Sequence, residues 1–544
     1  MRIFPLKKNL FRIFILLLLT PAIFLQGCFP TSSPQTETTA IEGYHYIEEY
    51  DLPELPAPVR PPRPGRFTLR YDPNSTVNPL TSLNRDNIVL SSLLYESLFV
   101  LDAQLIPHPL LAANWSSDDN VVFTIEIRPD VMMHDNANLT ANDVAYSIRQ
   151  ATRSGRFVNR LNSITRIEAT SELEVTIVLN APNSRFTHLL DIPIIRNGTS
   201  GNRLPPGSGP YRFSEFVQMR LEPFPLHRYH YDLPVSIIHL RDCLDTELTE
   251  LFDTGGLSLL WDDPASSFEI RLNRLREARY FETTTLQFIG FNTNHTALRD
   301  PDIRRAIGVS INRQYITENI MPPGLTLAAP VALSPAFQFY DEQWGYSHLP
   351  PLEEMGRLME RAGLYDFTQN LFLDLSDGRG GYTAFSIDFI VNIENTHKVL
   401  AAHQITERLR RNGLDVVVRE LPWDRFVTAL ETGNFDMFYG EVQLGADFDL
   451  SPLLLPGPLN FGRSASNEFR PFIYDFLRAQ TESEIRWASE RLVNEISINA
   501  PFAPILYKRH VIYTPIGAVT GATPSQSSVF RNFSDWTINL MMLT

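Results

Sequence analysis

A run of alternating strand and helix patterns between residues 385 and 449 constrains the fold of this chain more than any other segment. Apolar side chains alternate at the two-residue period of a strand over 385–391, and a helical pattern follows over 399–409. Strand patterns return at 414–421 and 435–442, with a short helical pattern at 423–431 between them. Strand, helix, strand, helix, strand predicts parallel pairing with right-handed crossovers, and therefore an α/β fold.

The residues after the third of these strands form the first candidate ligand-binding site. In open parallel sheets, ligands bind beyond the carboxyl ends of the strands. Leu444 and Phe448 flank three residues there: Gly445 and Ala446 expose backbone groups, and Asp447 offers a negative charge to a cation. The alternative is that Asp447 only begins a turn or caps the next element.

The length, composition and charge of the chain limit the classes of protein to which it can belong. The chain has 544 residues, which is enough for two or three domains, and its 43% hydrophobic and 20% charged residues are typical of a globular protein. Its formal charge of -15 argues against a nucleic-acid partner, because phosphate binding depends on clustered Lys and Arg. The common hydrolase signatures Gly-x-Ser-x-Gly and His-Glu-x-x-His are missing from the sequence.

The first 27 residues are typical of a signal peptide. Basic residues precede an apolar run over 13–24, which is shorter than the roughly 20 residues that cross a bilayer as a helix. The run ends in Leu25-Gln26-Gly27-Cys28, which resembles the lipobox of bacterial lipoproteins, where the cysteine becomes the lipidated first residue; the alternative is an ordinary secretory leader with a chance cysteine. With Cys28 lipidated, Cys243 has no disulfide partner, and we expect it to be a buried apolar residue.

Residues 28–66 predict an extended tether. The segment lacks periodic structure and closes with six prolines between residues 53 and 64. We expect it to hold a folded body, beginning near Phe67, away from a membrane surface.

Several separated motifs carry a family resemblance. They are Asn78-Pro79-Leu80, residues 95–99, residues 123–147, residues 207–213, and residues 289–293 with 304–313. Their content and order resemble family 5 of the extracellular solute-binding proteins, which deliver oligopeptides, dipeptides or nickel to ABC importers. The resemblance extends from about Phe67 to the C-terminus.

The resemblance implies a two-lobed fold of the periplasmic-binding-protein type II, the large class C, with an extra subdomain in the first lobe. Lobe I would comprise residues 67–287 and 505–544, including the subdomain at about 85–200, and lobe II residues 288–504. Two chain crossings, near 288–293 and 500–507, would make a hinge.

The implied function is capture of a peptide-like solute and its delivery to the transmembrane subunits of an ABC permease, without catalysis, cofactor or metal. Alternatives are binding of an oligosaccharide or a chelated metal and, in another class, a secreted hydrolase. We expect an extracytoplasmic monomer, held to the cell membrane by lipid on Cys28.

The resemblance also implies ligand contacts. It places Asp447 where peptide-binding members pair with the ligand's α-amino group, beside Gly445. Leu444 stands where many of those members have tryptophan, and Phe448 where tyrosine is common. Thr81 and Ser82, after the first motif, complete the candidate set.

Overall fold

The computed structural model describes residues 67–214, 219–266, 270–463 and 466–543, which belong to one compact unit that begins at Pro62. The predicted signal peptide, Cys28 and the tether lie outside the described residues. Among the helices of the described ranges, none combines the length and apolar character that a membrane crossing requires.

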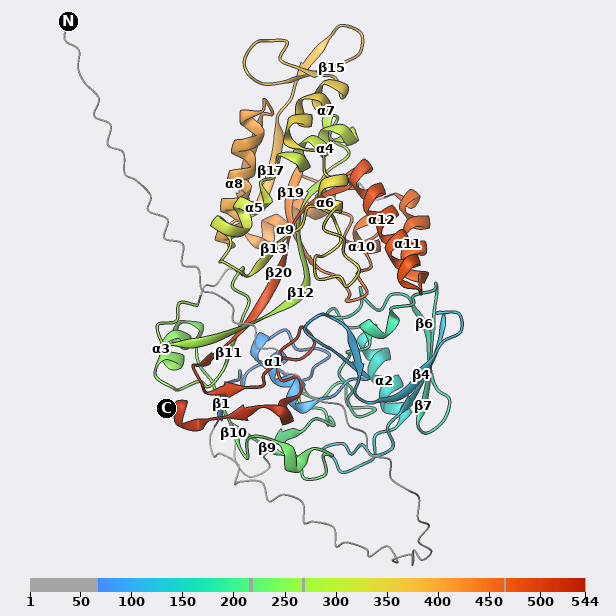
Figure 1. Cartoon of the computed structure of the whole chain (residues 1–544), viewed down its shortest axis with the longest axis vertical. Helices are drawn as coiled ribbons and strands as arrows, with labels where there is room; N and C mark the ends of the chain where they lie inside the picture. Colours follow the sequence, from blue (N-terminus) through green and yellow to red (C-terminus); the bar gives the residue numbers. More distant parts are fainter. Residues whose placement is uncertain (1–66, 215–218, 267–269, 464–465, 544) are drawn as a thin grey trace, which may run out of the picture. The chain divides into compact units, whose positions relative to one another are not determined.

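A seven-stranded mixed sheet organises the fold (Figure 1). Its order is β11-β20-β12-β19-β17-β18, and β13 also pairs with β20. The strands are β11 (Leu260–Asp262), β12 (Arg276–Phe291), β13 (Thr326–Ala328), β17 (Ile387–Asn392), β18 (Val416–Leu421), β19 (Met437–Gln443) and β20 (Phe502–Pro515).

The predicted parallel unit is confirmed. β17 pairs in parallel with both β18 and β19, and α8 (Thr396–Arg411) and α9 (Trp423–Thr432) make the crossovers. Gly413 and Gly433 follow these helices with φ of +87° and +73°, the left-handed conformation that ends a helix and that glycine adopts without strain.

Smaller sheets complete the fold. One has the order β1-β10-β9-β8, a second β4-β5-β7-β6 and a third β14-β15-β16, while β2 pairs with β3 and β21 with β22. Their bounds are β1 (Phe67–Arg70), β2 (Phe99–Leu101), β3 (Pro107–Pro109), β4 (Ala112–Ser116), β5 (Val122–Ile127), β6 (Ile164–Ala169), β7 (Glu174–Leu179), β8 (Tyr211–Phe213), β9 (Arg220–Pro223), β10 (Ile238–Arg241), β14 (Leu364–Tyr365), β15 (Asp374–Ser376), β16 (Tyr382–Ala384), β21 (Val519–Thr520) and β22 (Thr537–Ile538).

Side-chain caps mark the start of several other helices. Thr140 and Asp143 form a capping box at α2, and Asp300 accepts a hydrogen bond from Asp302 N at the start of α4. The helices other than α8 and α9 are α1 (Arg85–Leu94), α2 (Ala141–Ala151), α3 (Leu248–Asp253), α4 (Pro301–Ser310), α5 (Arg313–Tyr315), α6 (Trp344–Ser347), α7 (Met355–Arg361), α10 (Ser451–Leu454), α11 (Arg470–Arg478) and α12 (Glu482–Asn499).

Buried apolar side chains divide into two core regions. The first region draws its large cluster from residues 67–281 and 512–543. The second region draws its two clusters from residues 286–507, joined by Leu101, Leu105 and Ala265. One small cluster, from residues 248–272, lies beside the first.

β12 and β20 are the two strands that run through both core regions (Figure 1). Their antiparallel pairing is interrupted between Glu282 and Leu286. In this gap the Thr283 hydroxyl donates to the Lys508 carbonyl oxygen at 2.7 Å, and the Thr284 hydroxyl donates to the Leu444 carbonyl oxygen at 2.6 Å. The Thr283 hydroxyl therefore joins β12 to β20 in this gap, whereas the Thr284 hydroxyl joins β12 to the residue after β19, where backbone pairing continues.

The expectation that Cys243 is a buried apolar residue is only partly met. It is partly buried rather than fully buried, and it packs at the edge of the small cluster of residues 248–272. Burial raises the pKa of its thiol, so it remains a protonated side chain near neutral pH.

Candidate functional site

A polar cavity of about 530 Å³ lies where the two core regions meet. We call it the polar cavity. The first region contributes Arg70, Leu83, Asn84, Arg85, Asp86, Asp245, Leu248, Trp261, Asp262, Asp263, Ser266 and Ile270. The second contributes Asn392, Asn395, Lys398 and Glu441, and Lys508 comes from β20 at the boundary. Four cations and five carboxylates therefore line one space.

Lys508 is the centre of the cavity's ion-pair network. It is only 2% exposed, and its Nζ lies 2.5 Å from Asp263 Oδ2 and 3.4 Å from Glu441 Oε1. Lys398 Nζ reaches the same glutamate at 3.1 Å. Burial opposes ionisation of Glu441, but Lys398 and Lys508 outweigh it and hold its pKa at about 2.

Two charges on the wall of the polar cavity are not paired in this way. The Asp262 side chain is 2% exposed, and its Oδ2 has no hydrogen-bond partner among the described residues. Burial, with the neighbouring Asp263 carboxylate, raises the pKa of Asp262 to about 7. Arg85 is exposed, and its Cζ lies 5.4 Å from the centroid of the Trp261 ring.

The two core regions also meet at a second contact, where side chains of one region bond directly to the other. Residues 183–185 of the first region bind the second region through five hydrogen bonds, and we call this segment the clasp. The bonds are Asn183 Nδ2 to Asp447 Oδ2 (2.8 Å), Ser184 N to Leu477 O (2.8 Å), Ser184 Oγ to Ala479 O (2.6 Å), Arg185 Nε to Asp447 O (3.1 Å) and Arg185 Nη1 to Phe476 O (3.2 Å).

Asp447 lies inside the clasp. It is 2% exposed, and burial raises its pKa against the lowering effects of the Asn183 hydrogen bond and the Arg185 charge. The Arg185 guanidinium lies over the Phe476 ring at 4.0 Å, and its Nη2 has no hydrogen-bond partner within the described chain. The carboxylate also accepts a bond from Asp449 N at 3.3 Å, the local turn contact that the alternative interpretation predicts.

The neighbours of Asp447 are packed closely. Leu444 and Phe448 are 5% and 3% exposed, and Phe448 adopts a left-handed φ of 58° with its ring against Phe337. A Cβ at Gly445 would lie 2.4 Å from Asp447 Oδ1, so the turn requires glycine here. Phe448 and Ala446 line a separate cavity of about 310 Å³, which Arg185 also borders.

The other two predicted contacts lie just outside the polar cavity. Thr81 is exposed, and Ser82 is buried with an Oγ that lacks a partner in the described ranges. The wall begins at Leu83, the next residue, and continues through Asn84 and Arg85. The predicted segment therefore ends beside the cavity without lining it.

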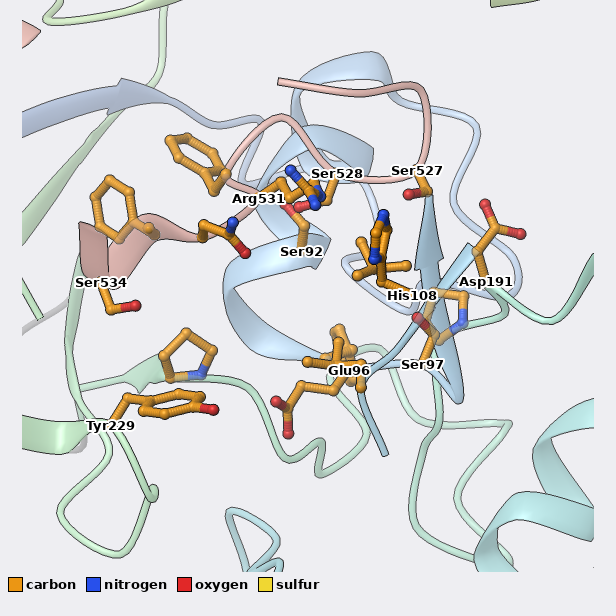
Figure 2. Close-up of a pocket in the computed structure, with 18 of the residues that line it drawn as sticks. Ser92, Glu96, Ser97, His108, Asp191, Tyr229, Ser527, Ser528, Arg531 and Ser534 are labelled. Carbon is orange, nitrogen blue, oxygen red and sulfur yellow. The ribbon is translucent and has the colours of Figure 1, made fainter. Parts of the chain in front are cut away.

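A third cavity, of about 450 Å³, lies within the first region (Figure 2). Figure 2 shows Ser92, Ser528 and Arg531 close together on one side of it, with Glu96 on another. Glu96 is buried, and the charges of Arg228 and His227 outweigh the effect of burial and hold its pKa at about 2. The buried charge of this cavity is thus satisfied by the chain itself.

The sequence reasoning missed most of the polar cavity. Trp261 and Asp262 close the short strand β11, Asp263 follows it, and Glu441 is the single charged residue of β19. Charges at the end of an apolar strand or within one are a signal of a site, but their partners depend on strand register.

The amino-acid sequence is similar to those of known bacterial binding proteins. The family model "Bacterial extracellular solute-binding proteins, family 5 Middle" matches residues 107–456. The chain is 22% identical to the periplasmic murein peptide-binding protein MppA of Escherichia coli K12 over 80% of this chain and 86% of that protein. A 24% identical match to the glutathione-binding protein GsiB of Pectobacterium atrosepticum spans 41% of this chain and 47% of that protein.

The fold is also that of a solved structure. The oligopeptide-binding protein AppA from Bacillus subtilis, in complex with a nonapeptide, superposes with a TM-score of 0.65 at 18% identity. The alignment covers 88% of this chain and all of AppA, which shows the predicted class of two-lobed α/β fold.

Proposed function

Because the chain belongs to family 5 of the bacterial extracellular solute-binding proteins, we propose that it captures a peptide-like solute in the polar cavity and delivers it to an ABC permease. The protein is a solute-binding protein of an ABC transporter and not an enzyme. The observation that carries the proposal is a cavity of about 530 Å³ with both signs of charge between two core regions. A peptide carries both signs and many hydrogen-bonding groups, which such walls can satisfy.

The two core regions would act as lobes that close on the solute. β12 and β20 are the strands shared by both, and their pairing is interrupted at Glu282, beside the cavity residue Lys508. A ligand that contacts both regions stabilises the closed arrangement by its differential affinity for it. This division is close to the predicted boundaries at residues 287–288 and 504–505.

Native mass spectrometry of the purified, unrefolded protein tests the proposal, because a solute receptor can retain its ligand. We expect an added mass that a peptide accounts for, released unchanged on denaturation. Small-angle scattering with di- to pentaalanine should then show a smaller radius of gyration at saturation. A radius unchanged by a bound peptide would contradict closure.

The sequence prediction that Asp447 pairs with the ligand amine stays a prediction. The prediction is supported by the position of Asp447, a buried carboxylate that follows a parallel strand. An amine that binds Asp447 would have to replace the hydrogen bond from Asn183. Asp447→Asn should then weaken free-amino peptides by at least about tenfold and hardly affect N-acetylated ones.

Membrane attachment is part of the proposal and rests on the sequence Leu25-Gln26-Gly27-Cys28. Metabolic labelling with a fatty acid should mark the wild type and not Cys28→Ser. Equal labelling of both would remove the lipoprotein assignment and leave the receptor function untouched.

A further inference from the structure

We infer that the polar cavity selects a zwitterion, an amino acid or short peptide, whose ammonium binds Asp262 and whose carboxylate binds Arg85. This inference rests on the proposed function and names the ligand groups that the site would recognise. It assigns the ligand amine to the polar cavity and leaves Asp447 to the clasp.

Seven of the nine charged side chains that line the polar cavity are already paired with one another. Three side chains of the first region pair with one another, and four near the boundary form the Lys508 network. The pairs are Arg70 with Asp86 (3.2 Å), Arg70 with Asp245 (2.6 Å), Lys508 with Asp263 (2.5 Å), Lys508 with Glu441 (3.4 Å) and Lys398 with Glu441 (3.1 Å). Asp262 and Arg85 remain, one anion and one cation.

Asp262 needs a cation or a proton. Burying an ionised carboxylate without a partner is costly, so the group either takes up a proton or binds a positive charge. The charged and titratable groups around it are Asp263, Arg85, Lys508, His510 and Tyr513. Lys508 is already bonded to Asp263 and Glu441, and Arg85 makes no hydrogen bond to Asp262, so the chain itself does not pair this carboxylate.

Arg85 is the complementary cation. It begins α1 and is exposed, and its guanidinium lies over the ring of Trp261, the residue directly before Asp262. Stacking on an aromatic face orients a guanidinium without using its N–H donors. Those donors can then bind a carboxylate through two parallel hydrogen bonds.

Other solutes leave at least one of the two charges unmatched. A neutral oligosaccharide supplies no ammonium to Asp262 and no carboxylate to Arg85. An anionic metal chelate would satisfy Arg85 but would bring a second negative charge toward Asp262. A zwitterion satisfies both groups at once, which makes it the class that this wall favours.

The amine partner is tested by calorimetric titration of trialanine and N-acetyl-trialanine, the probes, against wild type and Asp262→Asn. In the wild type, acetylation should weaken binding by at least tenfold. In Asp262→Asn the free peptide should already be weakened to that extent, and acetylation should cost nothing further. Trialanine amide and Arg85→Gln form the same cycle for the carboxylate.

Asp245→Asn is the matched control, since this carboxylate lines the same cavity but is paired with Arg70. It should keep the full penalty for acetylation. A penalty that survives in Asp262→Asn but disappears in Asp447→Asn would overturn this inference and leave the proposed function standing. Binding of maltotriose or a nickel–histidine complex, with no alanine peptide bound by the folded protein, would overturn both.

Discussion

The clasp and the polar cavity connect the same two core regions, yet they treat buried charge in opposite ways. In the clasp, Asp447 and Arg185 are enclosed by the chain and engaged by it, through Asn183 and through carbonyl groups of the second region. In the polar cavity, space remains and Asp262 keeps a buried oxygen without a partner. Burial alone therefore does not indicate a binding residue; a buried carboxylate oxygen that receives no donor from the described chain, beside open space, does.

The largest effect expected is from breaking the network of the polar cavity. Lys508→Met should lower the free energy of unfolding by about 3–5 kcal/mol, because Asp263 and Glu441 would lose a buried cation. Urea denaturation measures this difference. Arg411→Met, which removes an exposed pair with Glu407, should cost less than about 0.5 kcal/mol. Equal losses would mean that the buried network adds nothing to stability.

The unmatched carboxylate should make stability depend on pH. The pKa of Asp262 is about 7 in the folded protein and lies near 3.9 in an unfolded chain. The unfolded state therefore releases the proton first, and stability falls as the pH rises from about 4 to 7. Asp262→Asn removes this loss, so the variant should be more stable than wild type by roughly 2–4 kcal/mol at pH 8 and equal to it below pH 4.

Thermal unfolding of the unliganded proteins at pH 3.5, 6 and 8 measures that difference. Asp263, Arg85, Lys508, His510 and Tyr513 are present in both proteins, so the comparison isolates the Asp262 carboxyl group. A constant gap at all three values would place the effect in packing and not in ionisation.

The clasp should show a smaller effect that needs no ligand. Asn183→Ala removes a hydrogen bond to a charged carboxylate, which contributes about 1.5–3 kcal/mol. Asp447→Asn should weaken the same contact, and the double variant should lose less than the sum of the two single variants. Hydrogen exchange of the Ser184 N–H, which donates to the Leu477 carbonyl oxygen, would report the loosening. Additive losses in the unliganded protein would separate Asp447 from the clasp.

The smallest expected change in the free energy of unfolding distinguishes Arg85 of the polar cavity from Arg185 of the clasp. Arg85→Gln should change the free energy of unfolding by no more than about 0.5 kcal/mol, because this side chain is exposed and makes no ion pair in the described chain. Chemical denaturation measures it. A loss above about 2 kcal/mol would show that Arg85 has a structural role comparable to that of Arg185.

Periodicity predicted the part of the fold that depends on local pattern. The strands at residues 387–392, 416–421 and 437–443, their parallel pairing and the capped helices between them follow from side-chain spacing and from Gly413 and Gly433. Such signals are contained within about 20 residues, so one sequence can carry them.

The candidate site depends on contacts that no local pattern contains. Lys508 meets Asp263 across 245 positions, and Asn183 meets Asp447 across 264. The sequence marks Glu441 as an unusual charge within an apolar strand, but only the register of β12, β19 and β20 decides which cations reach it. Asn183 lies in a segment without regular secondary structure, where side-chain spacing does not predict which way a side chain points.

The interrupted ladder of β12 and β20 has a mechanical consequence. A continuous antiparallel ribbon resists twisting because each increment strains a row of backbone bonds held at fixed spacing. Between Glu282 and Leu286 the register of that row shifts, and the Thr283 hydroxyl, which turns about its own side-chain torsion, contacts the Lys508 carbonyl oxygen across the gap. Torsional compliance is thereby confined to a few residues, and each region can turn as a stiff body about a soft joint.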